Sequence, residues 1–139
     1  MLSRKKKDVC KREENRKRVN TLLLQELKEH PGRNFGKYFA EKGIQTIAVY
    51  GAGMVGEEVT RQLQKFIEVK YLIDKFDGRG KIGEIPILQF RFDFLPEVDA
   101  VIITPCHEVD FIMFQLRNYY TDDCQFLALD VLLEEVGDR

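Results

Sequence analysis

The chain has 139 residues, of which 44% are hydrophobic and 32% are charged. This length and composition fit one domain with a single core, so we expect no multi-domain enzyme. No apolar run approaches the roughly 18 residues of a membrane-spanning helix, and the charged segment near the start argues against an export signal. The three cysteines have neither disulfide nor zinc-ligand spacing, so we expect a soluble cytoplasmic protein with no metal site.

Charge is distributed unevenly along the chain. Residues 1–18 have a net charge of +6, whereas the remainder has a net charge of −7. The acidic body argues against nucleic acid as a partner. Residues 1–12 contain almost nothing that could be buried, so they are predicted to form a basic, flexible arm.

Two helices are expected in residues 13–43. The first would end at His30, before Pro31 and Gly32, and a second, short helix would end at Gly43. The apolar side chains of the first helix recur at helical spacing: Val19, Leu22, Leu23 and Leu27. This face either covers an edge of its own domain or pairs with a partner protein or a second copy in a homodimer.

Residues 44–139 alternate between strand and helix patterns. Strands are expected at residues 46–50, 69–73, 85–88, 99–104 and 126–129, and helices at 54–66, 107–119 and 132–136. Phe66 is expected on the inner face of the first of these helices, and Pro86 argues for an edge strand. Apolar strands that alternate with helices predict an α/β fold, a doubly wound, mainly parallel, five-stranded Rossmann-like sheet with an N-terminal helical lead.

A GxGxxG motif at residues 51–56 joins the first expected strand to the following helix. Gly51 would permit a tight turn, Gly53 would let a pyrophosphate approach the backbone, and Gly56 would let the helix pack closely on the sheet. The helix N-terminus would add N–H groups and a partial positive charge for phosphate oxygens. The alternative is that these glycines serve a tight crossover and bind nothing.

An acidic residue, Asp74, ends the next expected strand. A carboxylate there can accept hydrogen bonds from ribose hydroxyls. It favours NAD over NADP, because a 2′-phosphate would face its negative charge, although the nearby Lys75 and Arg79 weaken this preference. Lys75 is itself a candidate cofactor-binding residue. The alternative is that Asp74 is a solvated loop residue.

Four further motifs extend this pattern: Gly-Ile-x-x-Ile-Ala-Val-Tyr-Gly-Ala-Gly at 43–53, Ile-Asp at 73–74, Ile-Pro-Ile at 85–87, and Leu-Pro-Glu-Val-Asp-Ala-Val-Ile-Ile-Thr at 95–104. With them, residues 34–136 resemble the small Rossmann-like NAD(P)- or nucleotide-sugar-binding domains of bacterial surface-polysaccharide gene clusters. The sequence is more distantly similar to the N-terminal domain of bacterial sugar acetyltransferases and to the cofactor domain of nucleotide-sugar dehydratases.

The resemblance implies ligand contacts at seven residues: phosphate contacts at Gly51, Gly53, Met54 and Val55, ribose or base contacts at Asp74, and further contacts at Thr104 and Pro105. The chain departs from those relatives because it has neither the left-handed β-helix of the acetyltransferases nor the catalytic domain of the dehydratases. We therefore expect a nucleotide-binding module for NAD(H) or a nucleotide-sugar rather than a complete enzyme.

Two alternatives remain open. Cys106 and His107 follow the fourth expected strand, at the end of the sheet where α/β proteins bind ligands. A lowered thiol pKa at Cys106, or acid-base chemistry at His107, would suit a small NAD-dependent oxidoreductase or sugar-modifying enzyme. The structural alternative is that Cys106 is a packing residue and that His107 only begins a helix. The other alternative is a non-binding interaction protein that acts through its N-terminal helix.

Overall fold

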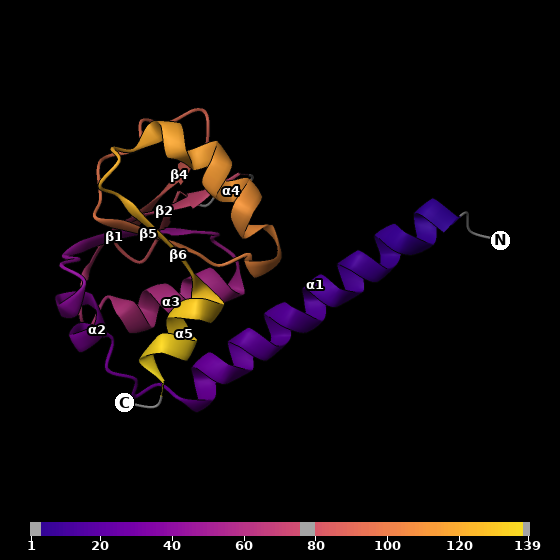
Figure 1. Ribbon diagram of the computed structural model, residues 1–139, viewed down its shortest axis with the longest axis horizontal. Coiled ribbons are helices and arrows are strands. Elements are labelled where there is room, and N and C mark those ends of the chain that lie inside the picture. The colour runs from indigo at the N-terminus through magenta and orange to yellow at the C-terminus, as the bar shows by residue number, and fades with distance from the viewer. Residues whose placement is uncertain (1–3, 76–79, 138–139) are drawn as a thin grey trace.

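The computed structural model describes residues 4–75 and 80–137, with side chains from Lys17 onward. Its centre is a six-stranded sheet with the strand order β3-β4-β2-β1-β5-β6 (Figure 1). The strands are β1 (Thr46–Tyr50), β2 (Glu68–Asp74), β3 (Lys81–Ile82), β4 (Ile85–Gln89), β5 (Ala100–Ile103) and β6 (Gln125–Ala128). The pairings are parallel except that of β3 with β4. The expectation of an α/β protein with a mainly parallel sheet is confirmed.

The expected count of five strands is wrong, because β3 adds a sixth. This strand pairs Ile82 with Ile85 across a tight turn at Gly83, whose φ of +58° suits a residue without a side chain. A strand of two residues is too short to show an alternating pattern in the sequence. The short hairpin was therefore not predictable from periodicity.

The position of β4 also differs from the expectation. Because β3 lies outside it, β4 is not the edge strand, and Pro86 pairs with Lys81. The ladder between β4 and β2 begins at Ile87, opposite Leu72. Ile87 N donates to Gly80 O at 2.8 Å on the β3 side, so the nitrogen of Pro86 faces away from β3 and its missing N–H costs no hydrogen bond of the β3–β4 hairpin, which is why a proline fits here.

Helices cover both faces of the sheet. The helices α2 (Phe35–Glu41), α3 (Met54–Leu63) and α5 (Leu129–Val136) share one buried core, whereas α4 (Val109–Leu116) contributes to a second core on the opposite face (Figure 1). Within β1, Ile47 and Val49 belong to the first core, and Ala48 and Tyr50 belong to the second. This division follows from the alternation of side chains along a strand.

The N-terminal helix α1 (Arg4–Glu29) is longer than expected and extends away from the sheet in Figure 1. Residues 4–12, expected to form a flexible arm, continue the helix because no Gly or Pro interrupts the sequence before Pro31 and because Lys, Arg and Glu favour helix. No helix in the described ranges combines the length and the apolar character needed to cross a bilayer.

Two other helix boundaries differ from the expected ones. The α3 helix ends at Leu63, so Phe66 lies beyond it, where its side chain is 43% exposed and meets the ring of Phe35 edge-on. The expected helix at 107–119 is α4 flanked by two short 3-10 turns, η1 (Cys106–Glu108) and η2 (Arg117–Tyr119). By contrast, the stop after α2 is as expected, because Gly43 has φ +70° and its N–H donates to Ala40 O at 3.2 Å.

Candidate functional site

A cavity of about 730 Å³ lies where β1, β2 and β5 end, and we call it the glycine-loop cavity. This volume falls in the range of about 300–1,000 Å³ that small-molecule sites occupy. The structure brings ten of the predicted site residues to its lining: Gly51, Gly53, Met54, Val55, Gly56, Asp74, Lys75, Thr104, Pro105 and His107. The remaining candidate, Cys106, is not part of the lining. Arg79 lies outside the described residues.

The three glycines of the loop differ in why they lack a side chain. Gly51 has φ +106°, and a Cβ on it would lie 2.3 Å from Thr104 Oγ1. A Cβ on Gly56 would lie 1.7 Å from the carbonyl oxygen of Gly51. The protein's own packing therefore requires both of these glycines. At Gly53 a Cβ would meet nothing within 4 Å, so the space beside this residue is open to a ligand.

The N-terminus of α3 faces the same cavity. Gly53 occupies the N-cap position of the helix and, as a glycine, has no side chain to form a capping hydrogen bond with the first turn. The first-turn residues Met54, Val55 and Gly56 line the cavity. A helix N-terminus carries a partial positive charge and directs N–H groups outward, so this wall suits the oxygens of a phosphate.

Asp74 is tied to the glycine loop. Its Oδ2 accepts a hydrogen bond from the N–H of Ala52 at 2.9 Å, and Gly51 N donates to Ile73 O at 2.8 Å. The carboxylate therefore holds the end of β2 against the loop, a role that the sequence pattern did not indicate. A carboxylate offers several acceptor positions, so this bond is compatible with contacts to ribose hydroxyls.

A tyrosine, Tyr50, also lines the cavity. Burial, and then the negative charges of Asp74 and Glu108, raise the pKa of the Tyr50 phenol above its ordinary value of 10.0. The phenol of Tyr50 therefore keeps its proton to a higher pH than an exposed tyrosine.

The end of β5 forms the other side of the cavity. Thr104 is buried, and both its N–H and its Oγ1 donate to Tyr50 O, at 3.1 and 2.8 Å. This pair of bonds fixes the spacing between the ends of β1 and β5, where Pro105 continues the lining. His107 and Glu108 follow, with His107 Nε2 3.6 Å from Glu108 Oε1. The side chains of His107 and Glu108 therefore add polar groups to this side of the cavity.

The surroundings of Cys106 disfavour its thiolate form. Burial raises the pKa of its thiol from 9.0 to about 11, which is opposite to the lowered pKa expected at a helix start. The Sγ atom donates to Thr104 O at 3.4 Å, and the side chain packs against the core on the α3 face of the sheet. The three-residue turn η1 is too short to provide a substantial dipole, so burial dominates the titration.

Three residues of the cavity lining come from α1: Asn20, Thr21 and Leu24. The sequence analysis did not identify them, because they precede the GxGxxG motif and belong to a different helix. The sequence held only a weak indication that this helix lines a site, namely two polar residues next to its apolar residues. Their contribution depends on how α1 packs against α3.

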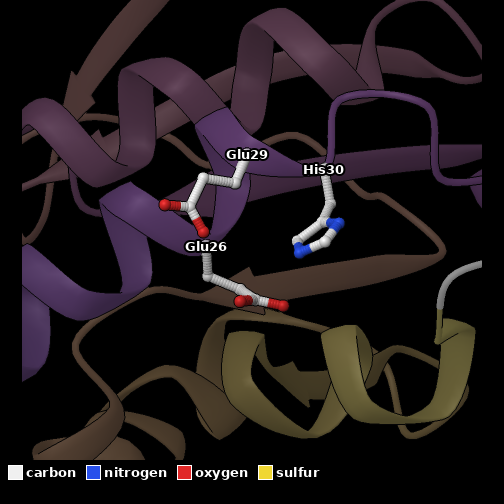
Figure 2. A group of neighbouring side chains, drawn as sticks. All are labelled: Glu26, Glu29 and His30. Atoms are coloured by element: carbon white, nitrogen blue, oxygen red, sulfur yellow. The ribbon is translucent and has the colours of Figure 1, made fainter.

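A second group of side chains lies at the end of α1, where Glu26, Glu29 and His30 place their ligand-type atoms within 4.8 Å of one another (Figure 2). The buried guanidinium of Arg33 forms an ion pair with Glu26 and donates to Gly137 O at 3.2 Å. Glu26 therefore already neutralises a buried cation. Arg33 thus links α1 to the end of α5, and this link explains why the side chains of Glu26, Glu29 and His30 lie close together. We assign no metal to these three residues.

No protein-family model matches the sequence, and no curated protein matches it significantly. A function for this chain is therefore inferred from the glycine-loop cavity and its residues.

Proposed function

We propose that the chain is a nucleotide-binding module that holds NAD(H) or a nucleotide-sugar in a doubly wound, Rossmann-like domain. The glycine-loop cavity is the observation that carries the proposal, because its lining combines the GxGxxG loop, a helix N-terminus and the acidic end of β2. The parallel strands lie side by side in the order β4-β2-β1-β5-β6. Numbered along the chain without β3, this order is 3-2-1-4-5. In such sheets ligands bind where the strand order reverses, here between β1 and β5.

The lining supports a division of the ligand into three parts. Phosphate oxygens would lie at Gly53 and the first turn of α3, and a ribose would lie at Asp74, with Lys75 beside it. The rest of the ligand, either a nicotinamide nucleotide or a sugar, would extend toward Thr104 and His107. Asp74 favours an unphosphorylated ribose, so we expect NAD(H) to bind better than NADP(H).

The proposed metabolic setting is bacterial cell-surface polysaccharide or sugar metabolism. Its support is the resemblance of residues 34–136 to domains of that kind, and in particular the motif at 43–53. We propose binding rather than catalysis, because the raised pKa of the Cys106 thiol removes the strongest candidate nucleophile.

Calorimetry on the full chain tests the proposal, with NADH, NADPH, UDP-glucose and UDP as probes. Gly53→Val fills the open space beside the loop, and we expect it to weaken binding at least about tenfold by displacing the phosphate. Gly32→Val is the matched control, because a Cβ at Gly32 also meets nothing within 4 Å, and Gly32 is not part of the cavity lining.

Binding of one probe that Gly53→Val weakens and Gly32→Val does not would support the proposal and identify the ligand class. A folded wild-type chain that binds none of the four probes would contradict it. The interaction protein that acts through its N-terminal helix would then be the better interpretation.

A further inference from the structure

The α1 helix lies along α3 and reaches the glycine-loop cavity. Gln62, near the end of α3, donates from Nε2 to Leu27 O at 2.8 Å. About one turn earlier in α1, Leu24 lines a hollow that it shares with Met54 and Glu57 at the start of α3. The two helices therefore run in the same direction, and the part of α1 before Leu24 passes the N-terminus of α3.

The next turn of α1 contributes polar groups to the cavity. Asn20 and Thr21 line it, together with Leu24. Thr21 Oγ1 donates its proton to Lys17 O at 2.8 Å, so toward the cavity this hydroxyl serves as an acceptor. The amide of Asn20 offers both a donor and an acceptor.

We propose that α1 forms a further wall of the ligand site, and that Asn20 and Thr21 bind hydroxyl groups of a sugar in the ligand. This inference rests on the proposed nucleotide-binding function and adds the part of the ligand that the N-terminal helix recognises. A sugar hydroxyl donates to an acceptor such as Thr21 Oγ1, and the apolar Leu24 and Met54 beside it suit the face of a sugar ring. The ribose of NADH and the hexose of UDP-glucose both supply this chemistry.

The test compares variants of α1 in the full chain by calorimetry with NADH, UDP-glucose and UDP. Thr21→Val removes the hydroxyl with little change of shape, and Asn20→Ala removes the amide. We expect each variant to weaken binding of a sugar-bearing probe about 3- to 10-fold, the effect of one lost hydrogen bond. Gln25→Ala is the matched control, because Gln25 is an amide of the same helix that donates to Glu29 at 2.9 Å and does not line the cavity.

The probes separate the two sugars. Weakening with UDP-glucose but not with UDP would support contact with the hexose, and weakening with NADH would support contact with a ribose. Asn20→Ala and Thr21→Val proteins that bind as tightly as wild type, while Gly53→Val binds at least about tenfold more weakly, would overturn this inference alone. A folded wild type that binds no probe would overturn the proposed function and this inference with it.

Discussion

The two walls of the glycine-loop cavity are built in different ways. The wall made by the ends of β1, β2 and β5 is held by hydrogen bonds between neighbouring parallel strands, from Gly51 N to Ile73 O and from Thr104 to Tyr50 O. The α1 wall is held by the packing of a separate helix, through Leu27 and its hydrogen bond from Gln62. The strand and glycine patterns of the sequence therefore indicate the first wall, whereas only the tertiary structure shows the second.

The largest effect is expected from a methyl group added to the strand wall. In Gly56→Ala the new Cβ would lie 1.7 Å from the backbone oxygen of Gly51, so the loop or the helix must move. We expect a loss of about 4 kcal/mol or more in the free energy of unfolding, measured by urea denaturation.

Gly53→Ala is the matched control for this change, because its Cβ would meet nothing within 4 Å. We expect its free energy of unfolding to remain within about 0.5 kcal/mol of wild type. Equal stability losses in the two variants would show that the packing of the glycine loop has been misassigned.

The next largest effect concerns the α1 wall. Leu27 is buried, with 1% of its surface exposed, so Leu27→Ala removes the apolar contact that holds α1 on the domain. We expect a loss of about 2–4 kcal/mol in the free energy of unfolding. Leu22, which is 59% exposed in the same helix, provides the control. Leu22→Ala should change the stability by no more than about 0.5 kcal/mol, and a similar loss in both variants would contradict the assigned packing of α1.

The difference between the walls also explains what the sequence could predict. The strand at β1, the turn at Gly51 and the acidic end of β2 follow from patterns within a few residues of one another, and they were predicted. The position of Asn20 and Thr21 in the cavity lining was not predicted. Helical periodicity shows that a helix has an apolar face, but it does not show which element covers that face. The buried Arg33 was missed for the same reason, since its partners Glu26 and Gly137 come from opposite ends of the chain.

A smaller effect should separate the two roles of Asp74. In Asp74→Ala the N–H of Ala52 loses its acceptor, and we expect a stability loss of about 1–2 kcal/mol. Asp74→Asn keeps an oxygen that can accept this bond but removes the charge. We therefore expect Asp74→Asn to be nearly as stable as wild type in urea denaturation. An Asp74→Asn protein as unstable as Asp74→Ala would show that the charge, rather than the hydrogen bond, stabilises the loop.

The last effect is a pH dependence at Cys106, which packs against the core beside the strand wall. Burial raises the pKa of Cys106 from 9.0 to about 11, so between these pH values the folded protein keeps a proton that the unfolded chain releases. Unfolding then loses a proton, and the contribution of Cys106 to stability falls as the pH rises through this window. Cys106→Ala removes this dependence while every other titrating group is the same in both proteins.

The difference in unfolding free energy, wild type minus Cys106→Ala, should therefore decrease from pH 8 to pH 11 in urea denaturation. The same slope should persist with a bound ligand, because Cys106 packs against the core and does not line the cavity. A difference that stays constant over this range would mean that the thiol ionises as easily in the folded protein as in the unfolded chain. Cys106 would then be considered again as a nucleophile, and the case for a binding module over an enzyme would lose the support that this residue gives it.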